Sequence, residues 1–432
     1  MLDPTAATNI LKRVYGPRLP RLLPDTVPLM KHIDMRQEPV EGADFRVPFT
    51  YQRNETGGYH AEGAAISGFG AGEDIGNEAE DVWVITPTRY DAAAEVTEEA
   101  IGRMRSNRGS FARPLAKEMK GVMSTYREIK EESLWGTGWG DLARVDQATP
   151  SGSTTVTMDD DIPTGDRGQG VRNLRPGMYV EFWSAQGTAG VRRSTTGVRK
   201  ISSISKASSN VVLASVTSTD VVNNDFVFRA RSRKTDSAVV SHAPMGIQGH
   251  LDSESLWTTY QGITRTTYTQ ADAQIFEEAN NALRPIDRDL MQIAVDSVDD
   301  EANAEFNGVD IIFFNRATRR SWVKKLEEFI RFQPLSQDKA GQPARLMYHG
   351  GARAIPMEVA RKCPLEKIYG LTSKSFHWLW ERKFGWLDQD GQILHKRQGY
   401  ANWLAEAMEL GNLFCEAPYQ NFVIADVDYT LS

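Results

Sequence analysis

The chain has 432 residues, of which 40% are hydrophobic, 25% charged and 9% aromatic. This composition is typical of a folded globular protein with two to three domains, and it excludes a disordered or fibrous one. There are 57 acidic and 50 basic residues, so the net charge of -7 offers no bulk basicity to hold a phosphate backbone. Strong direct packaging of DNA by this chain is therefore disfavoured.

The cysteines and the apolar segments indicate the compartment. Cys363 and Cys415 are the only cysteines, too few for a disulfide framework, and we expect free, buried thiols in a reducing environment. The N-terminal twenty residues lack the apolar core of a signal peptide, and no segment approaches the roughly 20 apolar residues of a membrane span. We expect a soluble, intracellularly made protein without a membrane partner.

Residues 1–40 indicate an extended N-terminal arm. They hold six prolines, with six basic residues against four acidic ones, and only Ala6–Tyr15 has a short helical pattern. Because proline fixes φ and removes a hydrogen-bond donor, we expect the remainder to lie along another surface. The basic surplus is too small to anchor a duplex, so we expect four cations to contact other subunits more than DNA: Lys12, Arg13, Arg18 and Arg21.

Residues 41–109 predict a long hairpin. Its first strand alternates apolar Val47, Phe49 and Tyr51 with other residues, and Asp81–Tyr90 forms its second strand. Seven of the twenty residues at 57–76 are glycine, and the whole segment carries 13 acidic against 6 basic residues. A two-stranded hairpin with little apolar surface is marginal in water, so we expect it to pack on an adjacent copy and not on its own domain.

Residues 110–136 predict the clearest helix. Ser110 suits the N-cap, and apolar residues recur at spacings of three and four up to the stop at Gly136.

The following hundred residues, 141–240, change to short β-rich runs, several of them bounded by turn signals, which predicts an inserted antiparallel β-barrel of five or six strands. Because these signals are self-contained, we expect residues 144–238 to fold when expressed alone, whereas the hairpin alone should not.

The rest of the chain predicts mixed α and β structure. Helices are expected over Ala271–Leu283, Asp287–Phe306 and Ala317–Glu328. Strands are expected over the following segments: Val309–Phe314, Ala354–Val359, Glu366–Leu371, Phe376–Arg382 and Asn421–Val427. Tyr400–Asn412 is expected to be one further long element.

A search for catalytic or ligand-binding motifs finds none that converge. The seven histidines show no metal-ligand spacing, and Gly68–Gly72 neither follows a strand nor opens a helix as a dinucleotide fingerprint would. Asp159–Asp161 and Asp388–Gly391 are better interpreted as turns than as calcium loops. Trp378 and Trp380 share one strand face, where core or interface packing is favoured. We therefore expect no enzyme activity and no cofactor, and assign no catalytic, cofactor-binding or metal residue.

The order of these parts resembles the major capsid proteins of tailed bacteriophages with the Hong Kong 97 fold. The run Cys363–Tyr369 followed by Leu371 is similar to a segment common in that family before a long hairpin, here Phe376–His395. The resemblance implies an α+β fold with an N-arm, an extended loop (Asp44–Tyr90), a spine helix (Ser110–Trp135), peripheral and axial domains, and an inserted barrel-like β-domain.

The expected domains divide the chain into seven parts. They are 1–40, the arm; 41–109, the extended loop and its flanks; 110–140, the spine helix; 141–240, the inserted β-domain; 241–360, mainly axial; 361–400, peripheral strands and hairpin; and 401–432, a return to the axial domain. Some relatives join subunits through a lysine of the extended loop and an asparagine near the peripheral hairpin. No lysine lies between Lys31 and Lys117, and no asparagine in Phe384–Gly399, so we expect no such cross-link.

The resemblance implies a mechanical function. We expect a virion capsid protein, made in the host cytoplasm, that assembles as hexamers and pentamers of an icosahedral shell around a double-stranded DNA phage genome. Scaffold, portal and decoration proteins are the further partners that it implies, with little specific contact to DNA. The alternative is an encapsulin-type cellular nanocompartment shell. A hydrolase with a carbohydrate-binding insertion is disfavoured, because its paired acid and base carboxylates are not evident.

Overall fold

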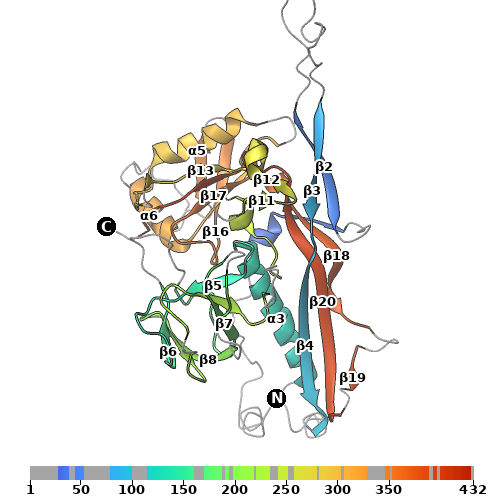
Figure 1. Ribbon diagram of the computed structural model, residues 1–432. Coiled ribbons are helices and arrows are strands. Elements are labelled where there is room, and N and C mark those ends of the chain that lie inside the picture. The colour runs from blue at the N-terminus through green and yellow to red at the C-terminus, as the bar shows by residue number, and fades with distance from the viewer. Residues whose placement is uncertain are drawn as a thin grey trace, which may run out of the picture.

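Two β-sheets, an inserted β-module and one long helix make up most of the computed structural model (Figure 1). The structure describes the following residues: 28–37, 44–52, 78–99, 114–159, 170–186, 190–193, 198–217, 220–233, 242–251, 257–279, 282–302, 306–327, 346–350, 353–388, 393–396 and 399–429. The predicted helix at Ala6–Tyr15, the four arm cations, the hairpin tip at 57–76 and the Ser110 N-cap lie outside these residues, as does most of Asp159–Asp161.

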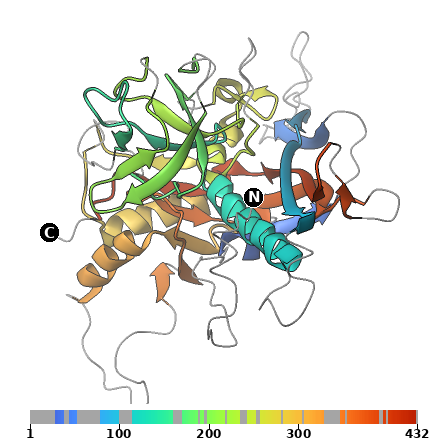
Figure 2. The ribbon, with the colours of Figure 1, turned by 90° about the horizontal axis from the view of Figure 1, so that it is seen from below.

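The first sheet is long and carries the helix α3, Pro114–Leu134, along one face (Figures 1 and 2). Its strands are β1 (Asp34–Gln37), β4 (Thr88–Thr97), β18 (Phe376–Trp386), β19 (His395–Lys396) and β20 (Asn402–Cys415). β20 pairs with β4 along ten residues, from Asn402↔Thr97 to Gly411↔Thr88. The paired residues Ala94 and Ala405 lie on the face that carries α3 and are buried, so small side chains let the helix approach the sheet.

The second sheet is six-stranded; one face packs on two helices of its own segment, and the other face packs on the C-terminal end of α3. Its strands run in the order β13 (Gln274–Phe276), β21 (Phe422–Ile424), β17 (Ile368–Leu371), β14 (Ile311–Phe314), β16 (Arg353–Val359) and β15 (Leu346–Gly350). Helices α5 (Arg288–Asp300) and α6 (Arg316–Glu327) accompany it, and Asp287 caps α5 through its side chain. Every residue of β14 is buried, which confirms the core strand that its apolar run predicts.

The inserted module forms a sheet of its own. Its strands run in the order β5 (Asp141–Arg144), β10 (Phe226–Arg229), β7 (Tyr179–Trp183), β8 (Arg199–Ser205), β9 (Asn210–Leu213) and β6 (Thr155–Thr157). A bridge between Val145 and Met158 joins the two ends of this order, so the sheet closes on itself. The predicted short strands are confirmed, and their apolar residues form a separate core that includes Val145, Val156 and Val227.

The separate core predicts that the module folds alone. A fragment of residues 141–233 should give dispersed amide spectra and unfold cooperatively, because it contains all six strands and their shared core. The fragment must begin at Asp141, since β5 pairs with β10. A fragment that begins at residue 147 lacks β5 and is the matched control, which should lose cooperativity. A disordered 141–233 fragment would show that α3 is needed to order the module.

The predicted hairpin consists of β2 (Phe45–Gln52) and β3 (Ala79–Ile85) and projects beyond the long sheet (Figure 1). Its base packs on a small hairpin of the same chain, β11 (Thr259–Tyr260) and β12 (Ile263–Thr264). Phe45, Trp83 and Ile85 are each at most 4% exposed. The expectation that the hairpin does not pack on its own domain is therefore wrong for the base, because one strand face carries enough aromatic surface to be buried.

Strand pairing corrects three further expectations. The helix predicted over Ala271–Leu283 is wrong, since residues 274–276 form β13, which pairs in parallel with β21. Phe376–His395 is not one hairpin, because β19 pairs with β20 in line with β18. The predicted boundaries at 361 and 401 do not separate the two sheets. β17 follows the first boundary but shares the six-stranded sheet with β16, and β20 follows the second boundary but shares the long sheet with β18.

The short helices and the end of the predicted arm complete the core. The short helices are α4 (Ile247–His250), η1 (Leu29–Lys31), η2 (Arg265–Thr267), η3 (Thr269–Ala271), η5 (Ser373–Ser375) and η6 (Pro418–Gln420). Leu29 of η1 is 1% exposed and packs into the core beside α3, and β1 pairs in parallel with β18. The described end of the arm is thus held by its own chain.

Candidate functional site

The C-terminal half of α3 buries charged side chains on two sides and so joins the modules of the chain. On the side of the long sheet, Lys130 donates to Glu409 of β20 at 2.5 Å, and both side chains are at most 4% exposed. Trp380 also donates its indole N–H to Glu409 at 2.6 Å. The Lys130 ammonium lies 3.2 Å from the Trp378 ring centroid and 5.9 Å from the Trp380 ring centroid. The two tryptophans therefore share one face of β18, as predicted.

This ion pair is strongly desolvated. Burial lowers the pKa of Lys130 to about 8, although Glu409 favours its charged form. Burial also raises the pKa of the neighbouring Tyr126, with Glu409 adding to the shift. Tyr126 stacks on Phe384 of β18 at a centroid distance of 3.9 Å. Polar pairing and aromatic packing together hold α3 on the sheet.

On the opposite side, two carboxylates of α3 bind cations of the inserted module. Glu132 accepts from Arg229 at 3.0 Å and from Arg175 at 3.4 Å. Glu128, one helical turn earlier, forms an ion pair with Arg175. Burial opposes ionisation of Glu128, but its paired arginines outweigh burial and hold its pKa below the ordinary value.

The segment after β16 reaches the same carboxylates. Lys362 donates to Glu132 at 3.3 Å, and Arg361 donates to Glu128 at 3.0 Å. Lys362 also donates to the side chain of Asn173 in the inserted module, at 2.9 Å. We call the paired charged residues on both sides of the helix the α3 junction; they are Glu128, Lys130, Glu132, Arg175, Arg229, Lys362 and Glu409. Through it, one helix connects the inserted module and the six-stranded sheet to the long sheet.

Glu131 lies between these two sides and is 2% exposed. The Trp135 indole donates to one of its oxygens at 3.2 Å. The other oxygen has no hydrogen-bond partner among the described residues. Burial raises the pKa of Glu131 to about 7, from an ordinary value of 4.5, and so favours its protonated form.

This shift predicts how stability depends on pH. Between about pH 4.5 and 7 the native chain binds the Glu131 proton more tightly than the unfolded chain does, so stability falls as the pH rises. Glu131→Gln should remove this slope and stabilise the protein at pH 8 by up to about 3 kcal/mol, with little effect at pH 4.5. Urea denaturation at both pH values measures it. The exposed Glu80→Gln is the control, and an unchanged slope in Glu131→Gln would contradict the assignment.

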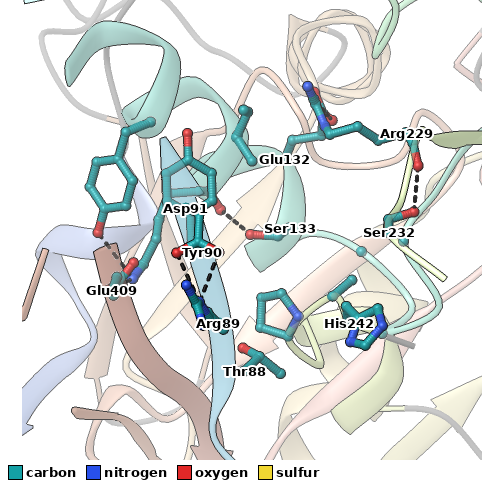
Figure 3. Close-up of a pocket in the computed structure, with 18 of the residues that line it drawn as sticks. Thr88, Arg89, Tyr90, Asp91, Glu132, Ser133, Arg229, Ser232, His242 and Glu409 are labelled. Carbon is teal, nitrogen blue, oxygen red and sulfur yellow. Dashed lines mark hydrogen bonds and ion pairs between the residues drawn. The ribbon is translucent and has the colours of Figure 1, made fainter. Parts of the chain in front are cut away.

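A cavity of about 460 Å³ lies beside the α3 junction, between α3, β4 and the inserted module. Figure 3 shows Arg89 and Asp91 of β4 on one wall, with Arg229 and Ser232 on another. Arg89 pairs with Asp91, and Arg229 pairs with Glu132. The Ser133 hydroxyl donates to the Lys130 carbonyl at 2.9 Å. These groups are thus engaged with protein partners, and the Arg229–Glu132 pair joins the inserted module to α3.

The remaining sequence candidates add no site among the described residues. Cys363 and Cys415 are free and buried, as expected, and burial raises the pKa of both thiols, that of Cys415 to about 12. No group of three or more His, Cys, Asp or Glu side chains is arranged to hold a metal ion in the described part of the chain. Of the helices in that part, none has the length and apolar character needed to cross a membrane.

The charged residues of the α3 junction were missed by the sequence analysis. The apolar spacing of the predicted helix runs through Tyr126, Ile129 and Ser133; the structure buries Tyr126, but it also buries Lys130, Glu131 and Glu132. The only local signal was the i, i+4 spacing of Glu128 and Glu132 around Lys130, which is equally common on solvated helix faces.

Comparison with known proteins identifies the fold. No model of a protein family and no curated protein sequence matches the chain. Among solved structures, the "Cyanophage A-1(L) capsid asymmetric unit" matches 99% of this chain and 98% of its own at 10% identity, with a TM-score of 0.57. The capsid of the empty GTA particle matches 99% and 98% at 10% identity, with a TM-score of 0.51.

The chain has the Hong Kong 97-like capsid fold. The holo-SrpI encapsulin complex from Synechococcus elongatus PCC 7942 matches 100% of this chain and 97% of its own at 11% identity, with a lower TM-score of 0.43.

Proposed function

We propose that this chain is a major capsid protein that self-assembles into the icosahedral shell of a double-stranded DNA phage. The observation that carries the proposal is the capsid fold over nearly the whole length of both chains, at 99% and 98% coverage. A match of this extent spans both sheets, α3 and the inserted module, so it is not limited to a common substructure.

The arrangement of contacts supports a mechanical role. The α3 junction connects three modules through buried ion pairs, which suits a shell subunit that must transmit load between its domains. The hairpin base is fixed to the body, while the hairpin projects away from it (Figure 1). A closed shell provides neighbours in every direction for such projecting segments.

The finer assignments belong to the same proposal. The subunits form hexamers and pentamers of a virion capsid, made in the host cytoplasm, and portal, scaffold or decoration proteins are further partners. The net charge of -7 favours DNA that is enclosed with little specific contact. The role is structural and not enzymatic. An encapsulin-type compartment with the same fold is the second candidate.

Expression of the full chain, followed by negative-stain microscopy and nucleic-acid analysis of purified particles, tests the proposal. We expect closed icosahedral shells, and in the native host we expect particles that contain double-stranded DNA. Shells that enclose a cellular enzyme and no genome would favour the encapsulin candidate. A chain that stays monomeric under all assembly conditions, with or without a co-expressed scaffold, would contradict both.

A further inference from the structure

The base of the β2–β3 hairpin is attached to the body by an aromatic face. Phe49 stacks on Trp83 at a centroid distance of 4.2 Å, and Trp83 meets Tyr260 of β11 edge to face at 5.6 Å. Tyr51 meets Tyr268 edge to face at 4.8 Å. Such contacts provide stability, but rings can slide over one another, so they specify direction less sharply than hydrogen bonds do.

Two side-chain hydrogen bonds cross this interface among the described residues. The longer one runs from the Gln270 side-chain amide to the Tyr51 carbonyl of β2, at 3.3 Å, and the shorter one has a carboxylate acceptor. The Tyr268 hydroxyl donates to Asp81 Oδ2 of β3 at 2.5 Å, and the Val82 amide donates to Asp81 Oδ1 at 2.8 Å. The Tyr268 hydroxyl holds the pKa of Asp81 below its usual value, and Asp81 in turn raises the pKa of Tyr268 to about 12. Asp81 is therefore ionised and Tyr268 is protonated across the physiological pH range, as the hydrogen bond requires.

A backbone contact lies nearer the body. The amide of Val84 donates to the carbonyl of Gln261, in the turn of the β11–β12 hairpin, at 2.8 Å. The turn approaches β3 so closely that a Cβ on Gly262, where φ is +87°, would lie 3.0 Å from the Val84 side chain. This contact fixes β3 near its C-terminal end.

The hairpin leaves the long sheet through Thr86 and Pro87, between β3 and β4. Asp81 lies five residues from Thr86, or about 16 Å along an extended strand. A hydrogen bond that tolerates about 0.5 Å of displacement at this distance limits the swing of the hairpin to roughly 2°. The Tyr268 hydroxyl is thus well placed to set the angle, whereas the Gln261 contact is closer to the pivot.

We propose that Tyr268 and Asp81 form a latch that fixes the direction of the β2–β3 hairpin before subunits meet. Its benefit rests on the proposed function, because a preset direction reduces the ordering cost of docking on a neighbouring copy. Tyr268 is a positioning residue in this role. The latch itself is a property of the unassembled chain.

The test measures the direction of the hairpin in unassembled full-length protein. Spin labels on cysteines introduced at the exposed positions Gln52 and Lys374 report the distance between hairpin and body, since both native cysteines are buried. Tyr268→Phe keeps the ring but removes the hydroxyl. We expect a broader distance distribution and roughly tenfold faster amide exchange in β3, corresponding to the loss of one hydrogen bond.

Two further variants make the test specific. Tyr348→Phe removes a hydrogen bond of 3.0 Å from β15 to Gln292 of α5 and should leave the hairpin distances unchanged. Asp81→Asn keeps one neutral acceptor oxygen and should lie between wild type and Asp81→Ala, whereas Asp81→Ala should behave like Tyr268→Phe. Wild-type distances and exchange in Tyr268→Phe, or equal broadening in Tyr348→Phe, would overturn the latch. Particle formation is scored separately, so a failure of the shell proposal remains distinguishable.

Discussion

Replacement of Lys130 by methionine is expected to destabilise the chain by about 3–5 kcal/mol, because the Glu409 carboxylate then stays buried without its cation. Glu409 is 3% exposed, and its remaining hydrogen-bond partners among the described residues, the Trp380 indole and the Tyr126 hydroxyl, carry no positive charge. The midpoint of urea denaturation, followed by tryptophan fluorescence, measures the loss. Trp378 and Trp380 lie next to the substituted side chain and report it directly.

Two variants separate the charge effect from other causes. Lys130→Met combined with Glu409→Leu removes both charges, and we expect it to recover most of the lost stability. Lys374→Met changes an exposed lysine and should shift stability by less than about 0.5 kcal/mol. A loss below about 1 kcal/mol in Lys130→Met, or a double variant no better than the single one, would show that the buried pair does not hold α3 on the sheet.

Local patterns in the sequence predicted the elements whose burial follows a regular period. Three observed strands overlap the ranges predicted for them, namely β2, β16 and β21. The helix α3 ends at Leu134, close to the predicted stop at Gly136. In the inserted module, turn signals bound several of the strands, so the predicted module was close to the observed one even though β5 was not recognised. In these segments propensity, pattern and tertiary packing agree.

The helix predicted at Ala271–Leu283 shows where local reasoning fails. Its apolar residues suit a helical spacing, but Gln274–Phe276 pairs with β21, about 150 residues later in the chain. Pairing with a buried strand satisfies the backbone of this segment, and propensities of a few tenths of a kcal/mol per residue do not compete with that. The sequence does not display the partner strand, so the segment alone favours the wrong element.

The α3 junction was beyond local prediction for the same reason. Lys130 and Glu409 are 279 residues apart, and Glu132 meets cations from 43, 97 and 230 residues away. A charged helix residue is usually solvated, and only the fold determines which of them become buried with partners. The resemblance in the order of parts predicted the architecture, but it could not predict which side chains join the modules.

The β2–β3 hairpin was predicted as an element, but the contacts of its base were not, and deletion of its tip gives the second large expected effect. Deletion of Gly57–Gly76 should leave a folded, soluble chain that does not close into particles. The base folds without the tip, because Phe45, Trp83 and Ile85 are buried against β11–β12 of the same chain. The deleted segment has seven glycines and almost no aliphatic bulk, so its removal costs the monomer little.

Assembly should respond very differently, since the segment has little apolar surface with which to order itself and is expected to act on a neighbouring copy. Sedimentation velocity should show subunits or capsomers in place of closed shells, and the thermal midpoint should stay within a few degrees of wild type. A variant in which a glycine–serine linker of equal length replaces the tip keeps the length of the segment but changes its sequence. If only the deletion fails to assemble, assembly requires the length of the tip and not its sequence. If both fail, the tip makes specific contacts. Normal shells from the deletion variant would contradict any role of the tip between subunits.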